Sequence, residues 1–131
     1  MNTGRFPIFV TFLLMFFSGP VHALGPKART CLELAASPAD QMLPDGVAGV
    51  PFGQIDTATA IRACEIAAEL AMNEGTDISL LTYTLGRAYQ AAQKYTKARV
   101  AYEVSATENN PLALNNLASL YYEGAGVEQD F

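Results

Sequence analysis

Cys31 and Cys64 are the only cysteines in the 131-residue chain, and their pairing is the first chemistry that the sequence predicts. In an oxidising compartment such a pair forms a disulfide, which here would close a loop of 34 residues. In the chain-entropy model a loop of that length stabilises a fold by about 3–4 kcal/mol. The alternative is two separate buried thiols that act as small apolar side chains. A redox-active role is disfavoured because the C-x-x-C spacing is absent. We therefore expect a structural disulfide.

The chain is otherwise poor in side chains that perform catalysis. Its one histidine, His22, lies in a segment that we expect to be removed, and tryptophan is absent. Without an imidazole neither Ser-His-Asp nor Cys-His catalysis is available, and two cysteines alone cannot complete a tetrahedral zinc site. Paired carboxylates remain open in principle. We predict a protein that is not an enzyme and that has no cofactor and no metal site.

Residues 1–23 have the three-part organisation of a secretory signal peptide. One positive charge, Arg5, precedes an apolar run over residues 8–17, and Val21, His22 and Ala23 form a small-residue cleavage site. The apolar run is shorter than the ~20 residues that a membrane-spanning helix needs. We expect cleavage after Ala23, a periplasmic or secreted protein, and no stable membrane insertion after cleavage.

The charge of the mature chain argues against one class of partner. Removal of the leader takes one of the eight basic residues and none of the thirteen acidic ones, so the formal net charge changes from −5 to −6. An acidic domain without a basic stripe repels phosphate backbones, and nucleic acid is not expected as a partner. The remaining 108 residues suit one domain with a modest core.

The first cysteine belongs to an N-terminal segment, residues 24–56. A short helical run around Cys31 ends before Pro38, and residues 38–53 form a loop rich in proline and glycine. We interpret this loop as an ordered flap that covers the first helices and is tethered by the disulfide. The alternative is that the loop binds a ligand.

The second cysteine lies on a longer predicted helix that precedes the repeats, in residues 57–76. Cys64 belongs to an apolar stripe with spacings of three and four residues, which is typical of a half-buried helix. Asp56 is a predicted N-cap and Gly75 a predicted stop.

The rest of the chain contains one helical phrase twice, in residues 77–110 and 111–131. At an offset of 32 positions, Leu85, Gly86, Ala88 and Tyr89 recur as Leu117, Ala118, Leu120 and Tyr121. A fixed offset of this size indicates stacked helical hairpins. The first copy predicts helices over residues 77–92 and 95–108 that are joined by a short turn. We expect the second copy to begin its first helix at Pro111.

Small and aromatic side chains define the expected packing of the repeats. Ala88 against Ala98 would allow close approach of two helices, while Tyr89 and Tyr102 would fill the space beside them. The expected repeat-core residues are Leu85, Gly86, Tyr89, Ala98, Tyr102, Leu117 and Tyr121.

The second copy resembles the sel-one-like repeat family, a relative of the tetratricopeptide repeat. The residues that carry the resemblance are Leu117, Tyr121, Gly124, Gly126, Val127, Asp130 and Phe131. The first copy lacks the Gly-x-Gly insertion, and Ala118 stands where the family usually has glycine. The resemblance covers about the last third of the chain. It implies an all-α solenoid of α-α hairpins, here an array that stops one residue into its last helix, and a scaffold that binds proteins.

The resemblance implies a peptide or helix of another envelope protein as the partner, since some exported members of the family regulate membrane sensor proteins. The candidate contacts are Tyr83, Leu120, Tyr122 and Phe131. Tyr83 and Tyr122 fall off the apolar stripes, whereas Leu120 and Phe131 lie at the end of the array, where no capping helix follows and self-association is a second expectation. The alternative function is an envelope-enzyme accessory or a cell-wall or carbohydrate-binding protein that uses residues 38–53.

Overall fold

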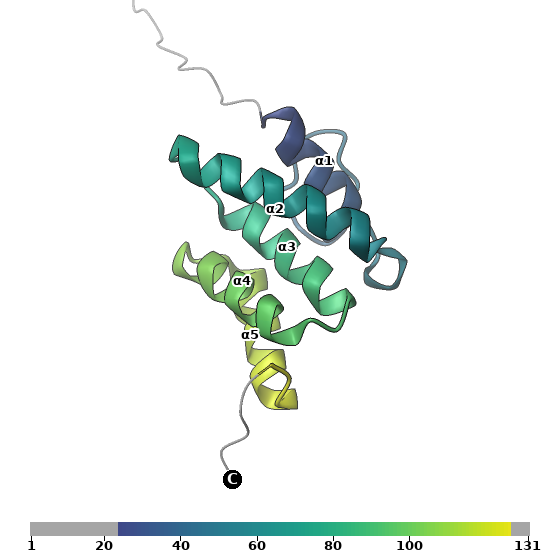
Figure 1. Cartoon of the computed structure of the whole chain (residues 1–131), viewed down its shortest axis with the longest axis vertical. Coiled ribbons are helices and arrows are strands. Elements are labelled where there is room, and N and C mark those ends of the chain that lie inside the picture. The colour runs from purple at the N-terminus through teal and green to yellow at the C-terminus, as the bar shows by residue number, and fades with distance from the viewer. Residues whose placement is uncertain (1–23, 127–131) are drawn as a thin grey trace, which may run out of the picture.

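A computed structural model describes residues 24–126, so that the predicted signal peptide and Phe131 lie outside the described residues. Within residues 24–126 the chain is all-α and contains no strand, as predicted. Its elements are α1 (Pro26–Ala35), a 3₁₀ turn η1 (Phe52–Gln54), α2 (Thr57–Glu74), α3 (Ser79–Ala91), α4 (Tyr95–Thr107) and α5 (Pro111–Glu123). The helices stack in chain order along the long axis of the molecule (Figure 1). None of these described helices is long and apolar enough to cross a membrane.

The helix ends lie where local chemistry predicts them. The carboxylate of Asp56 accepts the backbone N–H of Thr59 at 3.4 Å and caps α2, and Gly75 ends this helix with a φ of 66°. The side chain of Asn110 accepts the first two free N–H groups of α5 at 3.0 and 3.2 Å, and Pro111 occupies the first helical position. The predicted boundaries of α2 to α5 therefore agree with the structure to within two residues, whereas α1 begins at Pro26, four residues before the helical run that was predicted around Cys31.

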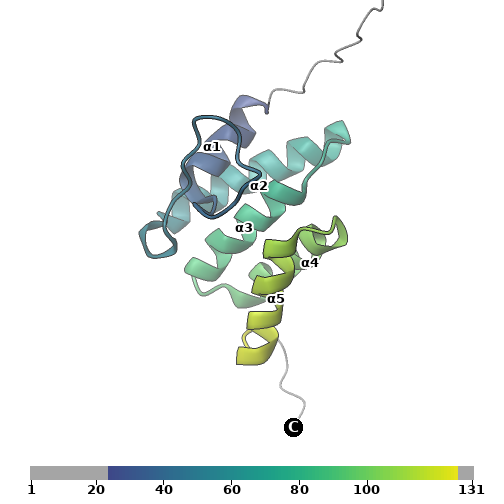
Figure 2. The same cartoon turned by 180° about the vertical axis from the view of Figure 1, so that it is seen from behind.

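Helix α3 is the central element because α1, α2 and α4 all contact it (Figures 1 and 2). Every residue from 81 to 89 is buried, including Thr84 and Arg87. A helix with one neighbour buries a single stripe, whereas one that is surrounded buries its whole circumference. The hydroxyl of Thr84 donates to the carbonyl of Leu80 at 2.8 Å, so this buried polar group is satisfied.

The close contact between α3 and α4 is made by Gly86, which corrects the prediction that Ala88 meets Ala98. A methyl group built on Gly86 would lie 2.5 Å from the ring of Tyr102. Ala98 is fully buried in the main core, but Ala88 packs in a separate cluster with alanines of α1 and α2. The prediction was wrong because α3 is covered on opposite sides, and the side that carries Ala88 faces the N-terminal helices.

The cysteine pair joins α1 to α2. The Sγ atoms of Cys31 and Cys64 lie 2.07 Å apart, at disulfide distance, and both side chains are fully buried.

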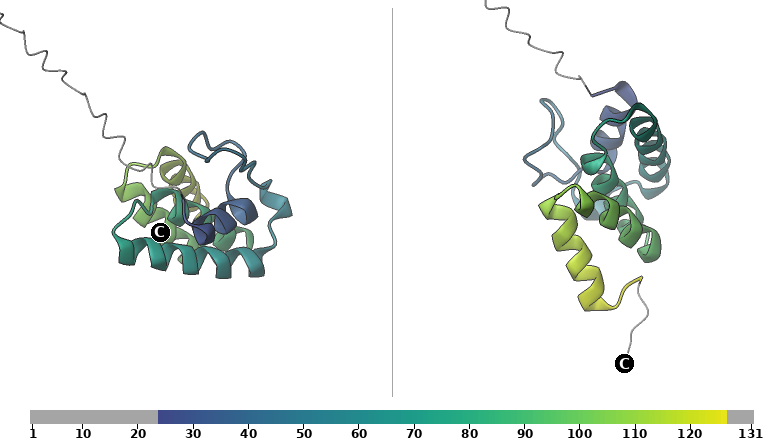
Figure 3. Two further views of the ribbon diagram at one scale, coloured as in Figure 1. Left: turned by 90° about the horizontal axis from the view of Figure 1, so that it is seen from above. Right: turned by 90° about the vertical axis from the view of Figure 1, so that its left-hand side faces the viewer.

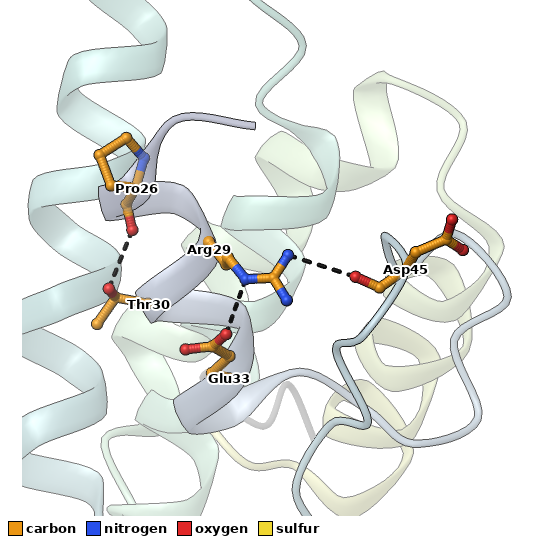
Figure 4. A network of polar contacts seen from close by, with 5 residues as sticks. All are labelled: Pro26, Arg29, Thr30, Glu33 and Asp45. Carbon is orange, nitrogen blue, oxygen red and sulfur yellow. Dashed lines mark hydrogen bonds and ion pairs between the residues drawn. The ribbon is translucent and has the colours of Figure 1, made fainter. Parts of the chain in front are cut away.

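The α1–α2 loop, residues 36–56, folds back onto α1. Arg29 of α1 donates to the carbonyl of Asp45 at 3.3 Å and pairs with Glu33 at 2.9 Å (Figure 4). Gly49 has a φ of 72°, and a methyl group there would approach the backbone at Pro38 to within 2.7 Å. The loop is therefore bonded to α1 through Arg29 and folds closely against its own first residues at Gly49, so residues without a periodic pattern have a defined place in the fold.

The turn after α5 contacts the beginning of α4. Gly124 and Gly126 have φ values of 66° and 71°, which agrees with the interpretation of this segment as a turn. A methyl group on Gly126 would lie 2.5 Å from the backbone of Tyr95, and Arg99 donates to the carbonyl of Gly126 at 3.0 Å. These contacts hold the end of the described chain against the first repeat hairpin.

Candidate functional site

The repeat tyrosines form a buried polar network that joins α3, α4 and α5. The hydroxyl of Tyr102 donates to Gln90 at 2.7 Å and accepts from Asn116 of α5 at 3.0 Å. Its ring centroid lies 5.9 Å from that of Tyr83. Burial raises the pKa of Tyr102, and the hydrogen bond from Asn116 opposes that shift. This tyrosine is fully buried and has the structural role that was predicted for it.

Tyr83 is buried, which corrects its prediction as a contact for a partner. Its side chain is only 3% exposed, because α3 has neighbours on all sides. A position outside the apolar stripe of this helix is therefore still covered. Burial raises the pKa of Tyr83, while the positive charge of Arg87 acts in the opposite direction. Tyr83 belongs to the core of the first hairpin.

Arg87 is a buried cation that holds the α1–α2 loop in place. Its guanidinium donates to the carbonyl of Ala35 at the end of α1 and to the carbonyl of Val50 in the loop, the latter at 3.1 Å. The ring of Phe52 lies 5.9 Å from its central carbon, and burial lowers the pKa of Arg87. The planar fork of arginine suits two carbonyls from different segments, so we assign Arg87 a structural role.

The predicted C-terminal contacts divide into buried and exposed side chains. Leu120 is fully buried, which corrects its prediction as an exposed contact: it faces the main core that α4 and α5 share. Tyr122 is 94% exposed and thus accessible to a partner. Phe131 lies outside the described residues.

The second copy of the repeat phrase is less buried than the first. Leu85 and Tyr89 are buried, but Leu117 is only partly buried and Tyr121 is 51% exposed, which corrects the prediction of Tyr121 as a core residue. The hydroxyl of Tyr121 donates to Glu103 at 3.0 Å. The difference follows from the number of neighbours: α3 contacts three helices, whereas α5 makes its main described contacts with α4.

A groove of about 550 Å³ lies at the end of the bundle where the α1–α2 loop approaches the α4–α5 turn. Three segments form its walls: residues 39–42 of the loop, the beginning of α3 with Asp77 and Ser79, and residues 108–112. Figures 2 and 3 place the loop and α5 on the same face of α3, away from α2. We term this depression the acidic groove.

Hydrogen bonds join two of the three walls of the groove. The hydroxyl of Ser105 donates to the carbonyl of Ser79 at 2.7 Å, and the side-chain amide of Asn110 donates to the hydroxyl of Ser79 at 3.3 Å. Asp77 accepts the backbone N–H of Ser79 at 2.8 Å. The beginning of α3 is thereby fastened to the α4–α5 turn.

The groove has a negative electrostatic character. Asp40, Asp77 and Glu108 line it, one from each wall, and none of the described lining residues is basic. Asp40 is 7% exposed; its Oδ1 accepts the N–H of Met42 at 2.9 Å, but its Oδ2 is buried without a hydrogen-bond partner in the described part of the chain. A buried carboxylate oxygen without a hydrogen bond lowers the stability of the fold, and a hydrogen-bond donor placed beside it would be favourable.

Sequence reasoning did not single out Asp40. It lies in a loop without periodicity, and no pattern in the sequence indicates that its side chain is buried. The nearest sequence signal was the expectation that this loop is ordered.

Comparisons of the chain with protein-family models, with curated proteins and with solved structures found no match. Among residues 24–126 there is no group of three or more Asp, Glu, Cys or His side chains placed to hold a metal ion.

Proposed function

We propose that the chain is an exported helical-repeat scaffold that mediates protein–protein interaction in the bacterial envelope and performs no reaction itself. The observation that carries the proposal is the acidic groove, a depression of about 550 Å³ built from a loop, a helix start and an inter-helix turn.

The repeat resemblance supports the same proposal. The α3–α4 hairpin followed by α5 has the order of helices that a tetratricopeptide-like or sel-one-like array would have. Such arrays bind peptides and the ends of other proteins on surfaces formed between neighbouring hairpins. Export would place Cys31 and Cys64 in an oxidising compartment, where a disulfide would stabilise the contact between α1 and α2.

The alternative, a cell-wall or carbohydrate-binding accessory, has less support. Amide side chains of Gln41, Asn109 and Asn110 could bond to sugar hydroxyls. However, none of the described residues that line the groove is aromatic, and a sugar ring would therefore have no flat apolar surface on which to stack.

Two measurements test the proposal. The mature chain, made with its leader in the periplasm, is immobilised and exposed separately to envelope extract and to isolated cell wall. A saturable protein partner supports the scaffold, whereas retention on cell wall alone contradicts it.

Intact-mass analysis of the same material after alkylation tests export and pairing: loss of residues 1–23 and no alkylated thiol are expected. A retained leader or two alkylated cysteines would contradict the exported, disulfide-bonded form.

A further inference from the structure

The acidic groove combines three carboxylates that come from separate segments of the chain. Asp77 and Glu108 are exposed at its edge, and Asp40 is almost completely buried in its wall. The three side chains do not form a group that could hold a metal ion, but no described lining residue is basic, so their combined negative charge makes the groove favourable for a larger cation.

The helix ends around the groove do not neutralise these charges. Helices α3 and α5 both begin here, and the partial positive charge of a helix start favours an anion. The start of α3 already has Asp77 as its acceptor, and the start of α5 is capped by the neutral side chain of Asn110. Glu108 follows the end of α4, where the partial charge of the helix is negative. Glu108 and Asp40 are therefore left without compensation from the helix starts.

Arg87 is the cation whose positive charge is attracted to Asp40, but it makes no ion pair with it in the described structure. Its two terminal nitrogens donate to the carbonyls of Ala35 and Val50 instead. Asp40 Oδ2 is therefore buried without a hydrogen-bond partner among the described residues, in a side chain that belongs to the wall of the groove. An incoming N–H donor with a positive charge would satisfy it with a charge-assisted hydrogen bond.

We propose that the acidic groove binds a basic segment of a partner protein, with one lysine side chain bonded to Asp40 and neighbouring positive charges attracted by Asp77 and Glu108. This inference rests on the proposed scaffold function and names its site and the chemistry of its partner. Met42, which is 77% exposed, and the partly buried Leu112 border the groove and provide apolar surface for the methylene stem of the lysine.

Binding of a model basic peptide to the mature chain tests the inference. The probe is a blocked hexapeptide that alternates lysine and alanine, and its counterpart with glutamate in place of lysine is the control. Amide spectra at about 150 mM salt should show shifts concentrated at Gln41, Ser79 and Asn109 with the lysine peptide. The glutamate peptide should leave these signals unchanged.

Three variants that each remove one negative charge locate the binding. Asp40→Asn retains an oxygen acceptor for the N–H of Met42 and should weaken binding about tenfold or more, as for a buried charge pair. Glu108→Gln should weaken it about two- to fivefold, as for an exposed pair. Glu69→Gln, an exposed carboxylate on α2 outside the groove, is the matched control and should have almost no effect.

Four results would overturn the inference. An equal loss of affinity in Glu69→Gln would show that only the net charge matters, and unchanged affinity in Asp40→Asn, with its amide spectrum intact, would show that this carboxylate is not used. Binding of the glutamate peptide as tightly as the lysine peptide would show that the groove does not select for positive charge. If the Asp40→Asn variant captures the same envelope protein as the wild-type chain does, and equally well, the acidic groove is not the binding site, but the scaffold function still holds. If the wild-type chain captures no protein, the scaffold function itself is refuted.

Discussion

Replacement of Gly86 by alanine should destabilise the fold, although the same change in most helix interiors stabilises it by about 1 kcal/mol. The new methyl group would lie 2.5 Å from the ring of Tyr102, which is nearly 1 Å inside ordinary van der Waals contact. The ring cannot move aside easily, because its hydroxyl is hydrogen-bonded to Gln90 and Asn116 and its side chain is fully buried. Overpacking of this kind costs about 1–3 kcal/mol, and each lost hydrogen bond about 1 kcal/mol more. After subtraction of the helical gain, we expect a net loss of about 1–3 kcal/mol in the free energy of unfolding.

Urea unfolding of the oxidised mature chain, followed by circular dichroism, measures this effect. Ala118→Gly is the matched control: it exchanges the same two residues at the equivalent exposed position of α5 and should cost only about 0.5–1 kcal/mol. A double-mutant cycle with Tyr102→Leu, whose smaller side chain relieves the overlap, should show a coupling between the two sites. A Gly86→Ala protein as stable as wild type, or more stable, would refute the assigned contact between α3 and α4.

Three further predictions concern the core. Ala98→Leu should lower the free energy of unfolding by about 1–3 kcal/mol, whereas Lys97→Leu, at the exposed position beside it, should change it by less than about 0.5 kcal/mol. Equal melting temperatures of the two variants would mean that the buried and exposed faces of α4 are wrongly assigned. Arg87→Met should leave the carbonyls of Ala35, at the end of α1, and of Val50, in the loop, unsatisfied at about 1–3 kcal/mol each. It should also increase hydrogen exchange in the α1–α2 loop, and unchanged loop protection would contradict its structural role. Burial raises the pKa values of Tyr89 and Tyr102, so their contribution to the free energy of unfolding should be constant below the unfolded tyrosine pKa of about 10 and should be lost as the pH rises above it. A urea midpoint that stays unchanged up to about pH 11 would show that these hydroxyls ionise as readily in the folded chain as in the unfolded one.

The features that sequence predicted well are those determined locally. Asp56, Gly75 and Pro111 mark helix ends because capping depends on a few neighbouring residues, and these ends are found where expected. The prediction that Cys31 and Cys64 pair rested only on an even count and on the expected export, and the two sulfurs lie at disulfide distance.

The features that sequence missed depend on how many neighbours an element acquires. Periodicity identifies one apolar stripe, so Tyr83 was expected to be exposed, but three helices cover α3 and bury it. Tyr121 was expected to be buried by analogy with Tyr89, yet it is half exposed because α5 has fewer described neighbours. Asp40 had no pattern to reveal it, since it lies in a loop without periodicity whose path is set by tertiary contacts.

Site-specific cross-linking in intact cells tests the central claim, that this chain is a protein-binding scaffold, most directly. A photo-reactive residue replaces Gln41, an exposed residue at the edge of the acidic groove, or Glu69 on α2 as the control position. The account predicts one discrete protein adduct from position 41, its loss when Asp40→Asn is added, and no such adduct from position 69. An absence of any protein adduct from position 41, or the same adducts from both positions, would contradict it.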